Sequence, residues 1–158
     1  MNSLIVGLGS ANGPDQLGWL LIDKLEKTSL NSTSTFIKSN GSGTDWFHEL
    51  HNSQNVIFLD AAFSHETPGN LLTLSYDELK SFTNPLSSTT HSISLLDSID
   101  LAKNIGVLNI PVHVIAISIG PEYLPNKFDD NEKLNIHSVS QKITLFIKSL
   151  NKQLITAT

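Results

Sequence analysis

The stretch "LIVGLGSANGPDQLGWLLIDKL", Leu4–Leu25, passes from an apolar run through a glycine-rich loop into an amphipathic segment. Leu4–Leu8 is short, apolar and followed by glycine, which predicts a buried strand. Over Asp15–Lys27 leucines recur at helical spacing, and Pro14 stands near the start, where proline favours a helix N-terminus. A buried strand, a tight loop and a helix in succession are typical of an α/β fold.

The rest of the chain alternates between the same two patterns. Further strands are predicted over Thr33–Lys38, Val56–Asp60, Leu71–Ser75 and Val112–Ile119. Further helices are predicted from about Thr44, over Ser75–Phe82 with a capping box of Ser75 and Glu78, from His91 to Gly106, and over Asn131–Leu154. The connection from Asp60 to Leu71 is shorter than the dozen or so residues of a parallel crossover, so Leu71–Ser75 should pair antiparallel at an edge. We therefore expect an α/β three-layer sandwich in which helices cover both faces of a twisted, mixed but mostly parallel sheet of five strands, formed by residues 1–158 as a single domain.

Composition excludes several classes of function. The 158 residues contain no cysteine, which rules out disulfides, thiolate metal sites and a cysteine nucleophile. All ten basic residues are lysine, so the chain has no guanidinium to clamp a phosphate. A net charge of −5 without charge runs argues against nucleic acid and anionic membranes as partners. No apolar stretch approaches a membrane span and the start lacks the basic region of a signal peptide, so we expect a cytoplasmic protein.

Three polar residues fall where an α/β sheet binds its ligands, outside the carboxyl ends of the strands. Asp15 opens the helix after the first strand, Asp60 ends the third strand, and His91 opens the helix that leads to the last strand. Each has an ordinary explanation, because Asp15 and His91 could simply be N-terminal helix residues and Asp60 could cap a turn. Their shared edge favours a different hypothesis, since two carboxylates and an imidazole can hold a divalent ion.

A nucleotide site is the competing hypothesis for the first loop. Gly7, Gly9 and Gly13 give a G-x-G-x-x-x-G pattern after a strand, which is a weak dinucleotide signal. The pyrophosphate of such a site rests on the helix N-terminus, where Asp15 would repel it. The strand Thr33–Lys38 also ends without the acidic residue that holds a ribose.

The remaining histidines give no comparable set of ligands. His48 and His51 in "HELH" share a helix face, and with no further carboxylate partner nearby we interpret them as a solvated surface. The other three, His65, His113 and His137, show no ligand-like setting.

In their order and spacing, these motifs resemble the [NiFe]-hydrogenase maturation endopeptidases over about Leu4 to Glu122. That family opens with a strand, G-x-G-[NS], an acidic pair and a glycine, here "LIVGLGSANGPDQLG". Its second block is an apolar strand ending in Asp-Ala, here "VIFLDAAFSHETPGNLLTL", and its third is a Ser/Thr-His pair opening a Leu-rich helix, here "STTHSISLLDSIDLAKNIGVLNIPVHVIAISIGPE". By position, the metal-contacting carboxylates of the family fall on Asp15 and Asp60, and its histidine on His91.

One position departs from the family pattern. Pro14 replaces the first member of the acidic pair, and Gln16 follows Asp15. We place the ligand on Asp15 because it lies three residues before Gly18, as the second acidic residue does in the family. An alignment shifted by one would put Gln16 there instead, and a neutral amide is a poorer ligand.

The resemblance implies a peptidase that removes the C-terminal extension of a hydrogenase large-subunit precursor after nickel insertion. Nickel would arrive on the thiolates of the precursor, Asp15, Asp60 and His91 would sense it, and no organic cofactor would be needed. The chain lacks a cysteine, a G-x-S-x-G elbow and an H-E-x-x-H motif, which suits such a protease. We expect a monomer whose partner is the precursor. Pro14 and Gln16 leave open a non-catalytic homologue that binds the large subunit as an assembly chaperone, and a small nucleotide-binding module is the third possibility.

Overall fold

The computed structural model describes residues 2–10, 16–40, 43–64, 66–81, 92–120 and 134–156, with the side chains of 92–94 excepted. The helices and strands follow in the order β1 (Ser3–Leu8), α1 (Gln16–Leu25), η2 (Ser29–Ser32), β2 (Ser34–Ser39), η3 (Phe47–Asn52), β3 (Asn55–Phe63), β4 (Leu71–Ser75), α2 (Tyr76–Ser81), α3 (Ser92–Asn104), β5 (Val112–Ile119) and α4 (Ile136–Thr156). Within these ranges no helix is both long and apolar enough to cross a membrane.

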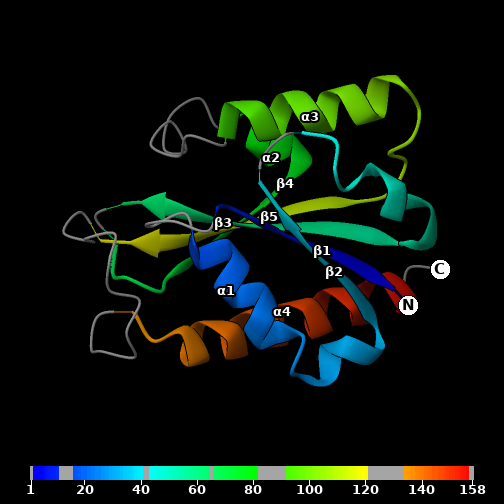
Figure 1. Cartoon of the computed structure of the whole chain (residues 1–158). Coiled ribbons are helices and arrows are strands. Elements are labelled where there is room, and N and C mark those ends of the chain that lie inside the picture. Colours follow the sequence, from blue (N-terminus) through cyan, green and yellow to red (C-terminus); the bar gives the residue numbers. More distant parts are fainter. Residues whose placement is uncertain are drawn as a thin grey trace.

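The five strands form one sheet in the order β2-β1-β3-β5-β4. The pairs β1–β2, β1–β3 and β3–β5 are parallel, whereas β4 runs antiparallel to β5 at the edge. Figure 1 shows α2 and α3 over one face of the twisted sheet and α1 and α4 over the other. The predicted mixed three-layer sandwich and its antiparallel edge strand are therefore confirmed.

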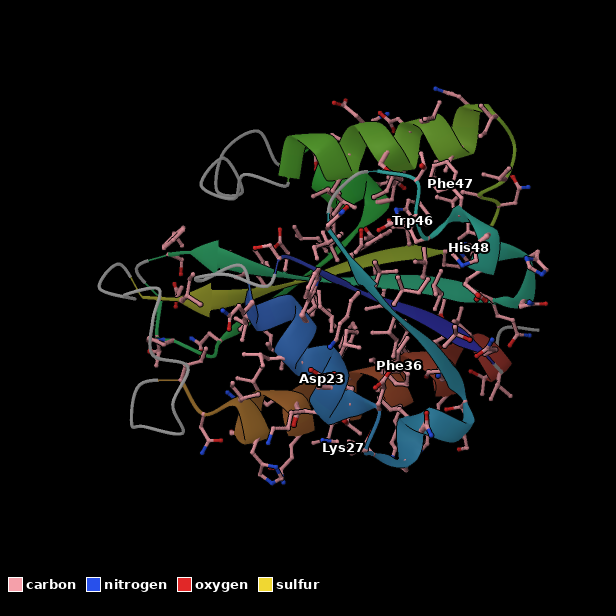
Figure 2. The ribbon with its side chains drawn as sticks, in the orientation of Figure 1. Asp23, Lys27, Phe36, Trp46, Phe47 and His48 are labelled. Carbon is pink, nitrogen blue, oxygen red and sulfur yellow. The ribbon has the colours of Figure 1, made fainter. Side chains whose placement is uncertain are left out.

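Each face of the sheet carries its own hydrophobic core. On the α3 face, Trp46 stacks edge-on against Phe58 of β3, with ring centroids 5.0 Å apart, and Figure 2 shows it beneath α3. On the opposite face, the leucines of α1 and the isoleucines of β5 pack against α4. The central strands are buried on both faces, which explains why they appear in the sequence as continuous apolar runs.

The backbones of β1 and α1 approach each other closely at two glycines. A Cβ on Gly18 would lie 2.1 Å from the carbonyl oxygen of Leu8, and one on Gly7 would lie 2.4 Å from that of Gly18. Real Cβ atoms do not come so near a backbone oxygen. Gly7 of the opening motif and Gly18 of α1 therefore serve helix–strand packing.

The structure differs from the sequence expectation at the ends of some elements. β3 continues through Asp60 to Phe63, because residues 61–63 keep pairing with Ile117, Ser118 and Ile119 of β5. The helix expected from about Thr44 is a 3₁₀ helix that begins at Phe47.

Two predicted helix boundaries are confirmed. The capping box has Glu78 accepting the backbone N–H of Ser75 at 2.7 Å, while Ser75 Oγ accepts that of Glu78 at 3.3 Å. Gly106, which follows α3, has φ +79°, a conformation that favours glycine.

Replacing Gly18 with alanine should destabilise the fold by about 3 kcal/mol, because the new methyl group must push α1 away from β1. Urea unfolding followed by circular dichroism measures the change. Gly106→Asn is the matched control, since nothing lies within 4 Å of its Cβ position and asparagine tolerates left-handed backbone. Equal losses from the two variants would contradict the packing role of Gly18.

His113 should make stability depend on pH. Burial lowers the pKa of this half-buried histidine below 6.5, an effect that the nearby charge of Glu78 partly offsets. As pH falls below about 6.5 the unfolded chain takes up the proton first, so stability present at neutral pH is lost until the folded state also protonates. Thermal melts of His113→Gln should show a shallower loss of stability between pH 7 and 5 than the wild type, and parallel curves would refute this assignment.

Candidate functional site

Asp60 is a buried carboxylate near the carboxyl end of β3. It is 7% exposed, and its Oδ1 accepts the backbone N–H of Ala61 at 2.9 Å. Side chains alternate along a strand, and Phe58 and Ala62 belong to the core beneath α3. The side chain of Asp60 therefore lies on the α3 face of the sheet.

The residues beside Asp60 form a short row across that face. Ala116 of β5 is the register partner of Asp60, and Leu72 of β4 is the partner of Ala116. Ala116 is small and buried, whereas Leu72 is 41% exposed. The row thus leads from the buried carboxylate to an exposed side chain at the edge of the sheet.

Two segments that lead towards the other predicted ligands lie, like Asp60, at the carboxyl ends of the strands. The partner of Gly7 in β1 is Leu59, so the chain leaves β1 directly beside Asp60. Helix α3 runs back towards the amino end of β5, so it begins, at Ser92, at the carboxyl edge (Figure 1). Asp15 and His91 themselves lie outside the described residues, and their convergence with Asp60 stays a prediction.

Hydrogen bonds fix the chain just beyond Asp60. Ser118 Oγ lies 2.8 Å from Ser64 Oγ and donates to the carbonyl oxygen of Glu66 at 3.2 Å. The carbonyl of Ser118 accepts the backbone N–H of Gly69 at 2.8 Å. These contacts hold the β3–β4 connection against β5, just beyond the strand that carries Asp60. No sequence motif singled out Ser118, Ala116 or Leu72, because their position beside the site depends on strand register.

The other histidines that the structure describes lie apart from Asp60. His48 and His51 are exposed on η3, as expected, and His48 Nε2 lies 3.4 Å from Glu49 Oε1. His113 pairs with Ile57, three residues before Asp60, and the ring of His137 on α4 lies 3.0 Å from Gln141 Nε2. His65 falls outside the described residues. In the part of the chain that the structure describes, no group of three acidic or histidine side chains could hold a metal ion.

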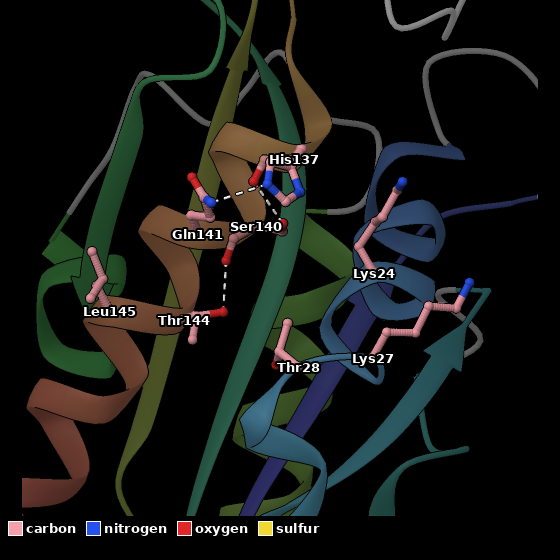
Figure 3. A pocket seen from close by; sticks show the side chains of 8 residues that line it. All are labelled: Lys24, Lys27, Thr28, His137, Ser140, Gln141, Thr144 and Leu145. Atoms are coloured by element: carbon pink, nitrogen blue, oxygen red, sulfur yellow. Dashed lines mark hydrogen bonds between the residues drawn. The ribbon is translucent and has the colours of Figure 1, made fainter.

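A separate groove of about 560 Å³ opens between the end of α1 and the first turns of α4 (Figure 3). Lys24 and Lys27 line one wall, and neither has an ion-pair partner among the residues described. Its hydroxyl groups are occupied, since Ser140 Oγ donates to the carbonyl of His137 and Thr144 Oγ1 to that of Ser140, both at 2.8 Å. The groove lies on the α1 and α4 face, so the sheet separates it from Asp60.

The geometry at Asp60 suits recognition of a cation or a water rather than of an anion. A carboxylate at the ligand-binding edge of an α/β sheet offers hard oxygen donors, which suit divalent ions, and an adjacent imidazole would add a borderline donor. The chain itself supplies no thiolate.

Comparisons with known proteins agree with the observed fold and also identify a family. A family model described as hydrogenase maturation protease matches residues 20–147, a range that includes Asp60 and His91 and begins after Asp15. No curated protein gives a significant match.

Solved structures of similar fold come from bacteria and archaea. The hydrogenase maturating endopeptidase HybD from Escherichia coli superposes with a TM-score of 0.66 at 17% identity, covering 94% of this chain and 93% of that one. The [NiFe] hydrogenase maturation protease HybD from Thermococcus kodakarensis gives 0.68 at 18% identity, with coverages of 95% and 99%. A hydrogenase 2 maturation peptidase from Thaumarchaeota archaeon SCGC_AB-539-E09 gives 0.58 at 22%, with coverages of 96% and 99%.

Crystals soaked in Ni²⁺ or Zn²⁺ should place one ion on Asp15, Asp60 and His91, with ligand distances of about 2.0–2.2 Å. Anomalous diffraction locates the ion. An ion held by His48 and His51, with the other three dispersed, would contradict the assignment.

Proposed function

This chain belongs to the hydrogenase maturation protease family, and on that premise we propose that it removes the C-terminal extension of a [NiFe]-hydrogenase large-subunit precursor after nickel insertion. The observation that carries the proposal is Asp60, a buried carboxylate at the ligand-binding edge of the sheet, within the range that matches the family. Its environment gives a second reason. Ala116, its small register partner in β5, adds little bulk beside the carboxylate, and the chain segments that lead towards Asp15 and His91 lie at the same end of the sheet (Figure 1).

In this proposal nickel is part of the substrate. The chain has no cysteine, so the thiolates that hold the nickel come from the precursor. Asp15, Asp60 and His91 bind the ion from the side of the protease, which completes a mixed set of oxygen, nitrogen and sulfur donors. A precursor without nickel lacks the ion that joins the two proteins, so cleavage reports on metal insertion.

The residues of the protease act by orienting the precursor. Asp60 is fixed by the strand that continues to Phe63, so an ion held by its carboxylate has a defined position relative to the sheet. The bound ion brings the cleavage segment to this edge, and a divalent ion can polarise either a peptide carbonyl or an attacking water. Both routes are compatible with this donor set, and neither requires a nucleophilic serine or cysteine.

A chaperone without peptidase activity is the second candidate. It is favoured by one observation, Pro14 and Gln16 on either side of Asp15, where the family pattern has an acidic pair. The two candidates differ in one measurement. A peptidase shortens the nickel-loaded precursor, whereas a chaperone binds it and leaves its length unchanged.

Replacing Asp15, Asp60 or His91 with alanine should lower processing of the nickel-loaded precursor at least about 100-fold, because each removes a direct ligand of the ion. His91→Ala should be the most severe, since imidazole is the softest of the three donors. Gln16→Ala should process at a rate close to that of the wild type. Mass spectrometry of the precursor after incubation measures the rates, with circular dichroism as the folding control.

The double variant Lys24→Ala/Lys27→Ala is the matched surface control, because the sheet separates its groove from Asp60. It should process normally. Normal cleavage by Asp15→Ala together with none by Gln16→Ala would move the ligand to Gln16. A wild-type protein that binds the loaded precursor without shortening it would favour the chaperone.

A further inference from the structure

The side of β4 that faces away from β5 is an edge at which another strand can add to the sheet. β4 lies last in the strand order and pairs only with β5 among the described residues. Edge strands present unpaired backbone N–H and C=O groups, and proteins use such edges to bind extended peptides.

The hydrogen bonds of β5 show which backbone N–H and C=O groups of β4 point away from the sheet. The carbonyl of Pro111 accepts the N–H of Val56 in β3, whereas the N–H of Ser118 donates to the carbonyl of Asn70, next to β4, at 2.9 Å. Backbone groups alternate in direction along a strand, so the N–H and C=O groups of the even-numbered residues of β5 point towards β4. Ala116 is therefore hydrogen-bonded to its partner Leu72. The backbone groups of the neighbouring β4 residues, including Thr73, then point away from the sheet.

The available edge is short. Ser75 also faces outwards, but its N–H donates to Glu78 Oε2 at 2.7 Å. This leaves the N–H and C=O groups of Leu71 and Thr73, for which the described part of the chain provides no partner. The outward N–H and C=O groups of these two residues can form backbone hydrogen bonds with a short extended peptide.

The edge is continuous with the candidate site. Leu72 is exposed and stands in the same row as Ala116 and Asp60. A strand added beyond β4 would lie three strand spacings from β3, or about 14 Å. An extended chain covers that distance with about four or five residues.

We propose that an extended segment of the large-subunit precursor, a few residues from the cleaved bond, adds to the sheet by pairing with Leu71 and Thr73 of β4. The inference rests on the proposed function for the identity of the peptide. A second copy of the chain fits the edge less well, because Glu78 already occupies the next outward N–H and Leu72 leads towards Asp60. The edge thus anchors the precursor while the ion positions the bond to be cut.

Thr73→Pro tests the pairing directly. The N–H of Thr73 points away from β5, so proline removes the outward donor without breaking the pairing of β4 with β5. With the nickel-loaded precursor of the same organism, Thr73→Pro should raise KM about tenfold and leave kcat within about twofold, because the lost contact is remote from Asp60. Thr73→Ala keeps the N–H and should behave as the wild type in both parameters.

A second measurement serves if Thr73→Pro fails to fold. In the wild type, residue-resolved hydrogen exchange should slow at Leu71 and Thr73 when the precursor binds, while Leu72 and Leu74 are already protected by β5. Unchanged exchange at Leu71 and Thr73 would overturn the proposal. So would equal KM values for a folded Thr73→Pro and Thr73→Ala, or a wild-type dimer that Thr73→Pro dissociates.

Direct titration of the precursor separates this inference from the proposed function. If the wild type binds without cutting, weaker binding by Thr73→Pro than by Thr73→Ala supports the edge while the peptidase proposal fails. If the wild type cuts and the two variants bind and cut alike, the peptidase proposal stands and the edge is refuted. A wild type that neither binds nor cuts the precursor refutes both.

Discussion

The contact between β1 and α1 is the constraint on which the arrangement of the site depends. Neither backbone could come so close if Gly7 or Gly18 carried a side chain. The close approach lets α1 begin next to the carboxyl end of β1 and lie flat on the sheet, where Leu17 and Leu21 are fully buried. It gives Gly7, the first glycine of the pattern that resembles a nucleotide loop, a packing role that needs no phosphate.

The position of Asp60 is set by the pairing of β3 with β5. Asp60 lies inside β3, and the strand continues past it because β5 offers partners as far as Ile119. A buried carboxylate on a strand that is paired on both sides of it along β5 has a defined position, which suits a group that must meet an ion carried by another protein. Burying a carboxylate is unfavourable by itself, so such a residue within an apolar strand is better explained by a role than by stability.

The two edge strands of the sheet, β2 and β4, have different roles. β2 is parallel to β1 and is followed by Trp46 and by η3, which begins at Phe47. The rings of Trp46 and Phe47 pack against each other and help close the core beneath α3. β4 is antiparallel, and its short connection from β3 brings it to β5, two strands from Asp60. The reversal of direction thus places near the site an edge that has no further strand partner among the residues described. Identities of only 17–22% to solved maturation proteases show that this layout tolerates extensive change of sequence.

The sequence by itself determined the helices and strands, the fold class and the choice of Asp60 as a candidate site residue. Apolar runs, helical spacing and the Ser75–Glu78 capping box are local signals, and the short Asp60–Leu71 connection dictated an antiparallel strand because a parallel crossover would not fit. The family motifs, which are also local in the chain, single out Asp60. Only the tertiary structure decided that β3 extends to Phe63 and that Ala116 and Leu72 stand beside Asp60, because register is set by which strands meet and residues far apart in the chain carry no local record of that pairing.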